Sequence, residues 1–598
     1  MFFALGSNSA FADGEYPTWP KDFPKGVFRL SAVPPAGANW QGLQNPGLIG
    51  KVIEKGELIN VKSCSSMNDP KCVDVNSWGS SSLFDFCNTP QQLDCIDSIK
   101  ATRATGEVLQ VKISDVFPGP RPQDYVGDPT LNLPDGGSTR LFTIDGITHE
   151  GGNQFLLMVN AKGSLEDWWF SGFTTNSRKF VNNLFMNLFA VKIKKGEFWY
   201  DPYKTDLKSY SDFMKVNGFN PGGNLMLGGW LNDGSECVLA TDKVCATPVP
   251  LPLDLNFTVN LRTSFRPGAQ SGAWFSGRIT DLKVKTAPRA SGGYSFEVGG
   301  SPIVAPTVSS SVNLSEIPES LNLFYQTHPN QSYGGVVHRE VNLTYPQARD
   351  QLEPSTWSFD RRIGEYNLDS MEEFVRWLPL LGDKATKMPT MWSVTPIYSG
   401  RLGSGPSNGP QARAQAELNC LDATSTIAGF VATNATQYID TWPTFNKAEG
   451  SLEYTVAAPH FEPDGKTVFK GTYDLAINED VARCLYGFSS APIKATVQVT
   501  SSTGQEQIAT TTLRRENGML FLSAKGFTFS SPTIRVKLSQ EKVEKAQEAS
   551  SNTATAAEAR STTKPVALKK SITCSKGKLL KKVTGTNPKC PKGYKLNK

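Results

Sequence analysis

Short segments in which apolar and polar residues alternate recur along most of this chain. Alternation with a period of two residues is typical of β-strands that bury one face. In the first half it predicts strands over Val108–Ser114, Phe155–Asn160, Phe189–Lys194 and Phe257–Arg262. Segments rich in Gly, Pro, Asn and Asp separate them and favour turns. The pattern therefore predicts a mainly β fold.

The same alternation returns between about residues 450 and 540. Six segments there have the spacing of strands in a β-sandwich, namely SLEYTVAA, TVFKGTYDLAI, KATVQVTSS, QIATTTLR, MLFLSAKGFTF and TIRVKLSQ. Helical periodicity is rarer. Its best example begins at Ser370-Met-Glu-Glu373, a capping box followed by apolar residues at helical spacing, and Pro379 should end it. A second helix is predicted from Pro410.

These patterns predict tandem β-sandwich-like domains with a smaller α/β segment and a flexible basic C-terminal tail. The expected divisions are a remnant signal peptide (1–12), two β-rich domains (13–150 and 151–315), a mixed α/β segment (316–410), a β-sandwich-like domain with an N-terminal helix (411–540), a linker (541–571) and a basic disulfide-clasped tail (572–598). A chain of 598 residues is long enough for several such cores.

A weak internal repeat supports two related β-domains in the first half. The segment VNAKGS (159–164) is followed by WFSG (169–172), and VNLRTS (259–264) is followed by WFSG (274–277). The spacing between the two parts differs by five residues, as a loop insertion would allow. Chance similarity is the alternative over so short a match.

The cysteines indicate an oxidising environment. There are ten, an even number, and three pairs share the spacing Cys-x7-Cys with turn-forming residues between them. Local pairing is therefore the simplest hypothesis, although ten cysteines allow many other pairings and the sequence alone proves none. The predicted bridges are Cys64–Cys72, Cys87–Cys95, Cys237–Cys245, Cys420–Cys484 and Cys574–Cys590. Free thiols in a cytosolic protein are the alternative.

The N-terminal residues agree with export. Ala10-Phe11-Ala12 is an A-x-A cleavage site, and the apolar stretch before it is too short for a complete signal peptide. We interpret residues 1–12 as the end of a signal peptide, with an untargeted terminus as the alternative. The sequence contains no run of 18 apolar residues that would cross a membrane as a helix.

Two C-terminal regions resemble parts of known exported proteins. The segments VATNATQYID, EPDGKTVFKGTYDL, DVARCLYGFSSAPIKATVQV and LFLSAKGFTFSSPTIRVKL resemble a domain that recurs in large secreted actinobacterial proteins. The closing ITCSKGKLLKKVTGTNPKCPKGYK resembles a short basic two-cysteine tail on exported proteins of the same bacteria. The resemblance covers about a quarter of the chain. It implies a secreted, envelope-associated protein and carries over no catalytic residue.

Signatures of catalysis are weak. None of the four histidines forms H-E-x-x-H, and His149-Glu150 is more simply a structural turn. Ser407 matches G-x-S-x-G only inside a longer Gly/Ser/Pro-rich run. The chain has no C-x-x-C, which argues against zinc ribbons. Paired carboxylates would need a cleft to act on polysaccharide. We therefore predict no metal and no cofactor.

Tryptophans on the predicted β-domains are candidate glycan-binding residues, because aromatic faces stack on sugar rings. The candidates are Trp168, Trp169 and Trp274. Adjacent residues on a strand point to opposite faces, so one of the first two would be exposed. A role in a sandwich core is the alternative, since tryptophan is a large apolar side chain.

The C-terminal tail concentrates positive charge. Residues 561–598 contain eleven lysines and no acid, while the whole chain carries a net charge of +5. A lysine cluster on a tether attracts anionic cell-envelope polymers or glycans, and an exported chain seldom meets nucleic acid. The candidate polyanion-binding residues are Lys576, Lys578, Lys581, Lys582, Lys589, Lys592 and Lys595. A solubilising end is the alternative.

Two hypotheses follow for function. The first is an exported, non-catalytic surface protein associated with the cell envelope: an adhesin, a glycan binder or a structural protein. The second is an extracellular hydrolase acting on polysaccharide. The hydrolase needs carboxylates that face each other across a groove, whereas the surface protein needs exposed binding residues on its β-domains.

Overall fold

The computed structural model describes most of the chain in separate segments. They are residues 25–32, 47–55, 57–117, 119, 124–165, 179–195, 238–240, 244–268, 273–328, 335–337, 345–363, 368–397, 420, 426–439, 442–488, 493–500, 506–507, 510–529, 533–540, 570–576, 579–585, 589–590 and 594–596. The chain forms two compact units, Met1–Glu541 and Lys542–Lys598. The predicted signal-peptide remnant, the helix start at Pro410 and nearly all of the linker lie outside the described residues.

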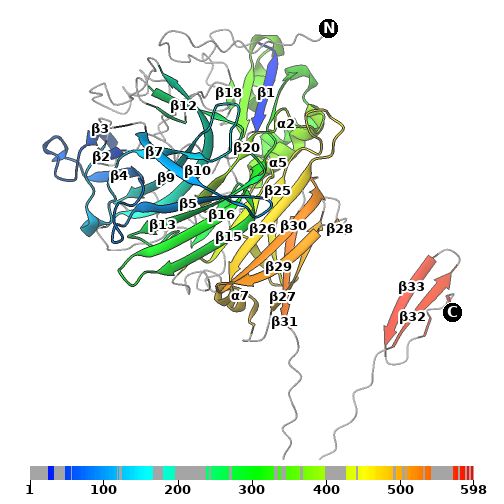
Figure 1. Cartoon of the computed structure of the whole chain (residues 1–598). Helices are drawn as coiled ribbons and strands as arrows, with labels where there is room; N and C mark the ends of the chain where they lie inside the picture. Colours follow the sequence, from blue (N-terminus) through cyan, green and yellow to red (C-terminus); the bar gives the residue numbers. More distant parts are fainter. Residues whose placement is uncertain are drawn as a thin grey trace, which may run out of the picture. The chain divides into compact units, whose positions relative to one another are not determined.

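The first unit is built on a central sheet of 15 strands (Figure 1). Eleven follow one path: β29 (Thr510–Glu516), β30 (Met519–Thr528), β26 (Lys470–Asn478), β22 (Gly429–Thr433), β14 (Trp274–Gly277), β21 (Ser393–Pro396), β10 (Val181–Lys195), β9 (Gln154–Ser164), β4 (Ser77–Leu83), β2 (Gly47–Glu54) and β3 (Glu57–Cys64). Beside them lie β7 (Val111–Phe117), β8 (Thr139–Ile144), β11 (Leu239–Ala240) and β12 (Val244–Val249).

Two six-stranded sheets flank the central one. The first flanking sheet contains β15 (Ile279–Pro288), β16 (Tyr294–Val304), β13 (Leu255–Thr263), β5 (Cys95–Arg103) and β6 (Val108–Leu109), with β20 (Thr390–Met391) beside β16. The second contains β23 (Gln437–Tyr438), β25 (Ser451–Ala457), β31 (Thr533–Gln540), β27 (Ile493–Thr500) and β28 (Glu506–Gln507), with β24 (Thr444–Asn446) beside β25.

Alternation along β22 shows how the three sheets are layered. Phe430 and Ala432 belong to the core shared with the first flanking sheet, which also contains Val259 of β13. Val431 belongs to the core shared with the second flanking sheet. Successive residues of a strand point to opposite faces, so this part of the central sheet is covered on both sides.

The predicted mainly β fold is confirmed, and the six strands predicted between residues 450 and 540 correspond to β25, β26, β27, β29, β30 and β31. The sheets, however, cross the predicted boundaries at 150, 315 and 410. In the central sheet β4 pairs with β9, and β14 pairs with both β21 and β22. Segments expected in separate domains therefore share one sheet.

A smaller α/β layer completes the first unit. Its sheet contains β17 (Val308–Asn313), β1 (Val27–Ala32), β19 (Phe359–Ile363) and β18 (Gly335–Val337). Its core includes residues of α2 (Glu319–Thr327), α4 (Tyr345–Gln351) and α5 (Leu368–Trp377). The helix predicted at this position is confirmed as α5, but it begins at Leu368, so Ser370 lies inside the helix and the expected capping box does not form its start. Among the described residues no helix is long and apolar enough to cross a membrane.

The weak repeat falls on β9 and β13, one strand in each of two packed sheets. Asn160 donates a hydrogen bond to Ser81 at 2.9 Å, and Asn260 donates one to Ser98 at 3.1 Å. In each case the serine lies on the neighbouring strand of the same sheet. The two copies therefore occupy comparable positions, although residues 169–172 of the first copy lie outside the described residues.

Asp474 is a carboxylic acid buried between the central and first flanking sheets. It lies on β26, is 4% exposed, and accepts a hydrogen bond from the Thr280 hydroxyl at 3.1 Å. Burial raises the pKa of Asp474 from its usual 3.8 to about 6. The folded state therefore binds the Asp474 carboxyl proton more tightly than the unfolded chain does.

We expect Asp474→Asn to stabilise the chain at neutral pH. The protonated Asp474 carboxyl group contributes stability at acid pH. This contribution is lost as the pH rises through about 6, because the buried group must then ionise. The variant should therefore be more stable than the parent by about 2–3 kcal/mol at pH 7.5, and the difference should vanish below pH 4. Urea unfolding of both chains across this range measures it. If the difference in free energy of unfolding between parent and variant does not change with pH, the prediction is wrong.

Candidate functional site

Disulfides clasp two surface loops and one longer segment of the first unit. Cys64 pairs with Cys72 and Cys87 with Cys95, each over eight residues of sequence. Cys420 pairs with Cys484 of α7 (Glu479–Tyr486), 64 residues away. All three bridges are among the five predicted pairings, and the first two have the shared Cys-x7-Cys spacing.

The other two predicted bridges are not fully described. Cys237 lies outside the described residues, and Cys245 lies on β12 without a described side chain. Cys590 is disulfide-bonded, whereas the side chain of its predicted partner Cys574 is outside the described part. These two pairings therefore remain predictions.

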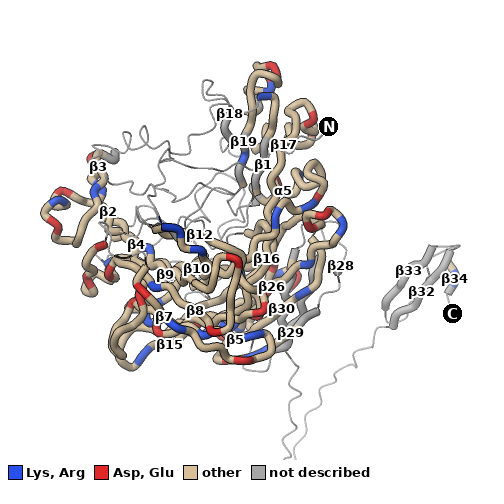
Figure 2. The backbone as a smooth tube through the Cα atoms, turned by 45° about the horizontal axis from the view of Figure 1, so that its top comes forward, with Lys and Arg blue, Asp and Glu red and all other residues tan. Residues whose placement is uncertain are grey.

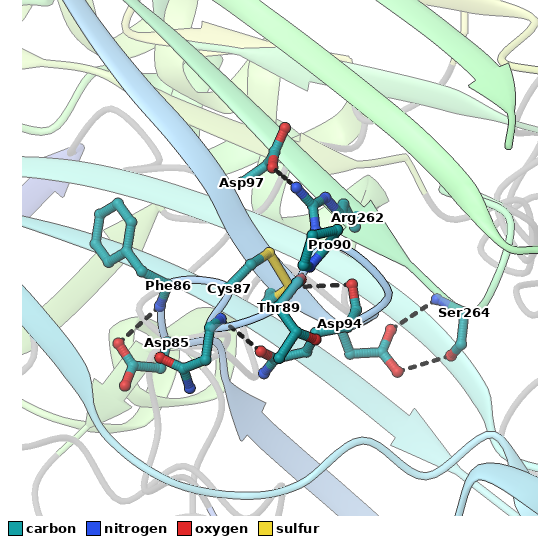
Figure 3. Close-up of a disulfide and its surroundings, with 12 residues drawn as sticks. Asp85, Phe86, Cys87, Thr89, Pro90, Asp94, Asp97, Arg262 and Ser264 are labelled. Carbon is teal, nitrogen blue, oxygen red and sulfur yellow. Dashed lines mark hydrogen bonds and ion pairs between the residues drawn. A yellow bond between two sulfur atoms is a disulfide. The ribbon is translucent and has the colours of Figure 1, made fainter. Parts of the chain in front are cut away.

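The Cys87–Cys95 loop is held against the first flanking sheet (Figure 3). The Ser264 backbone N–H and hydroxyl both donate to the Asp94 carboxylate at 2.8 Å. Arg262 of β13 pairs with Asp97 and donates to the Thr89 carbonyl oxygen at 2.8 Å. Burial raises the pKa of Asp94, but both of its oxygens accept bonds from Ser264. The arrangement fixes a loop rather than preparing an acid for catalysis.

The Cys64–Cys72 loop is organised by a single carboxylate. Asp69 accepts hydrogen bonds from the Ser65 backbone N–H and hydroxyl and from the Lys71 backbone N–H. These donors stabilise the charged form and lower the pKa of Asp69. The disulfide therefore joins the two ends of the loop, and the hydrogen bonds to Asp69 fix the conformation between them.

Trp274 is wrong as a glycan-binding candidate. Its side chain is 1% exposed and belongs to the core under the second flanking sheet. The indole lies over Gly429, its partner on β22, where a Cβ atom would come within 2.2 Å of the ring. A ring enclosed in this way cannot stack on a sugar. Trp168 and Trp169 lie outside the described residues.

The second unit contains a three-stranded antiparallel sheet of β33 (Leu579–Gly585), β32 (Lys570–Lys576) and β34 (Lys595–Leu596). The register places Lys581 opposite Cys574 and Lys582 opposite Thr573. The side chains of Lys589 and Lys595 are exposed. Lys578 and Lys592 lie outside the described residues, and the side chains of Lys576, Lys581 and Lys582 are not described.

The catalytic candidates gain no support from the described residues. His149 bonds the Gln154 carbonyl oxygen at 2.9 Å and accepts from the Gly151 N–H, and burial lowers its pKa. It therefore closes the turn before β9. Ser407 lies outside the described part, and no described group of three or more His, Cys, Asp or Glu residues could hold a metal ion.

One exposed surface, on the first flanking sheet, carries none of the motifs named in the sequence. The outward positions of the first flanking sheet carry polar and basic residues, including Lys100, Thr258 and Lys283. The strict alternation of LNFTVNLRT on β13 is the signal that could have found it, because every second residue there is polar.

Comparisons with known proteins give a limited result. No protein-family model matches the chain. A stretch of 92 residues, 15% of the chain, is 38% identical to halomucin of Haloquadratum walsbyi (strain DSM 16790 / HBSQ001). The match spans 1% of the length of halomucin, so it assigns no activity to this chain.

Proposed function

We propose that this chain is an exported, non-catalytic surface protein whose basic tail binds anionic polymers of the cell envelope. The concentration of charge in the tail carries the proposal. Eleven lysines and no acid lie within residues 561–598, so the remaining 560 residues have a net charge of 5 − 11 = −6. The net positive charge is thus confined to the second unit, where an extended polyanion can be bound.

The disulfides support the extracellular part of this proposal. Bridges of this kind persist in oxidising surroundings and are rare in the cytosol. Three close within the described residues, and Cys590 takes part in another. The partial similarity to halomucin is compatible with such a role without giving a specific function.

The small sheet of the second unit explains how the tail would bind rather than only solubilise. Solubility requires no fixed conformation, whereas a sheet closed by the predicted Cys574–Cys590 bridge would hold its lysines at set positions. Lys595 lies opposite Ser575 in this sheet, and Lys589 is next to the disulfide-bonded Cys590. Both lysine side chains are exposed and available to an anionic ligand.

We expect the tail lysines to determine retention at the envelope. In the neutral-tail variant, glutamine replaces all eleven lysines of residues 561–598 in the full chain, namely Lys564, Lys569, Lys570, Lys576, Lys578, Lys581, Lys582, Lys589, Lys592, Lys595 and Lys598. Each lysine near an anionic surface contributes about 1 kcal/mol, so even Lys589→Gln/Lys595→Gln should weaken binding to poly(glycerol phosphate) about 30-fold. Fractionation of the native host should find the neutral-tail variant in the medium, while the parent stays with the envelope.

A variant with arginine at the same eleven positions is the matched control, because it keeps the charge. It should bind and be retained like the parent, and added salt should weaken both. If the neutral-tail variant stays with the envelope as well as the parent does, the tail is not the anchor and this part of the proposal is wrong.

A further inference from the structure

The outward side of the first flanking sheet is a polar face formed by β15, β16, β13 and β5. Along β13, inward residues such as Val259 are buried in the core, whereas the alternate residues Asn256, Thr258 and Asn260 are partly exposed. A strand with this alternation turns one side to the core and the other to solvent. We refer to the solvent side of these four strands as the polar face.

Four residues form one straight row across the polar face. In register they are Lys283 on β15, Gly299 on β16, Thr258 on β13 and Lys100 on β5. Adjacent strands lie roughly 4.8 Å apart, so the two lysines stand about 14 Å apart across three such steps. We call this set the lysine row.

Gly299, at the centre of the lysine row, is buried and closely covered by its neighbours. A Cβ atom added at Gly299 would lie 2.7 Å from the Thr258 hydroxyl oxygen and 2.9 Å from the Phe257 carbonyl oxygen. The position therefore has room for hydrogen only, because the Thr258 side chain and the sheet backbone pack closely against it. Asn256 and Asn260 lie on either side of Thr258 along the same face of β13.

The charges on the polar face are unevenly matched. Lys285 stands opposite Glu297 in the neighbouring row, and Arg262 pairs with Asp97. The lysine row contains no acid, and the exposed Lys100 and Lys283 form no ion pair with another described residue. Figure 2 shows that acidic and basic residues are otherwise interspersed along the first unit. The row itself therefore contains two cations and no anion, and Glu297 stands beside it, two residues from Gly299 on the same face of β16.

From this arrangement we infer that the polar face binds a linear acidic polysaccharide across the lysine row. The two lysines would hold anionic groups at the ends of the row, and Thr258, Asn256 and Asn260 would hydrogen-bond sugar hydroxyls between them. This inference names a ligand class for the surface protein proposed above and rests on that function. It places the glycan site on the lysine row instead of on Trp274.

The composition of the face favours a polysaccharide over other polyanions. Binding of single-stranded nucleic acid relies on aromatic side chains that stack on bases, and the lysine row and its neighbours contain none. A lipid surface would require exposed apolar or aromatic residues to enter it. Hydroxyl and amide groups between separated lysines instead match a hydroxyl-rich chain with spaced charges.

The test measures polygalacturonate binding by calorimetry. It uses the full chain in the neutral-tail background, so that the tail lysines do not contribute. We expect Lys100→Ala/Lys283→Ala to weaken binding about tenfold and Thr258→Val to weaken it about threefold. Lys100→Arg/Lys283→Arg should bind like its parent. The matched control is Lys447→Ala/Lys466→Ala, two exposed lysines away from this sheet, which should leave the affinity unchanged.

The outcomes separate this inference from the proposed function. Unchanged affinity in Lys100→Ala/Lys283→Ala, or no binding by the neutral-tail background, overturns the polysaccharide site whether or not the tail anchors the chain. Equal binding of fully methyl-esterified polygalacturonate also overturns it, because recognition would then not depend on the carboxylate charge. Equal binding of oligodeoxythymidylate overturns it as well, because recognition would then not depend on the polysaccharide. Thermal unfolding of each variant shows that the fold is retained.

Discussion

Replacing Glu373 with alanine is expected to destabilise the first unit by about 3–5 kcal/mol. Glu373 of α5 is 0% exposed and pairs with Arg361 of β19 through two hydrogen bonds of 3.0 Å, to Oε1 and to Oε2. The Tyr325 hydroxyl also donates to it at 2.6 Å. Removing the carboxylate leaves the Arg361 charge buried without its partner, and this desolvated charge is the source of the large effect.

The neighbouring residue offers a matched control for this prediction. Glu372 pairs with Arg376 one turn along the same helix, and both side chains are exposed to solvent. Exposed pairs of this kind contribute less than about 1 kcal/mol. Urea unfolding followed by tryptophan fluorescence should therefore separate Glu373→Ala clearly from Glu372→Ala. Similar midpoints for the two variants would show that the buried pair does not stabilise the α/β layer.

Loss of the Cys420–Cys484 bridge is expected to cost about 4 kcal/mol. A disulfide limits the conformations of the unfolded chain, and the effect grows with the length of the closed loop. These cysteines are 64 residues apart, whereas Cys87 and Cys95 are only eight apart. Cys87→Ser/Cys95→Ser should therefore cost less, about 2.6 kcal/mol.

Denaturant unfolding of the two double variants tests this order. Serine preserves the size of the side chain, so differences in packing stay small. Cys420 is 6% exposed, and its loop joins α7 to a segment far away in the sequence. An equal loss in both variants would indicate that loop entropy does not govern these bridges and that local contacts around each one do.

Local patterns were enough to predict much of the secondary structure. The two-residue alternation of LNFTVNLRT became β13, and the apolar residues at helical spacing from Met371 became part of α5. The spacing Cys-x7-Cys gave two bridges that the structure contains, because a short turn brings both ends of such a segment together. Each of these signals acts between residues that are close in sequence.

The candidate site was less predictable. A tryptophan on a β-segment is equally compatible with an exposed face and with a core, and the sequence offers no means to choose. All four residues of β14 are buried, because the strand lies in the part of the central sheet that is covered on both sides. The lysine row was not predicted either, since its members come from four strands between residues 95 and 304.

The sequence by itself determined many of the strands, the helix α5, the local disulfides and the charge of the tail. These features depend on side-chain periodicity, turn chemistry and composition, which are properties of short segments. Only the tertiary structure decided which strands are neighbours, that Trp274 is enclosed, and that Lys100 and Lys283 share one row. Strand order joins residues hundreds of positions apart, and the interactions that select it are hydrophobic burial and hydrogen bonding between whole sheets.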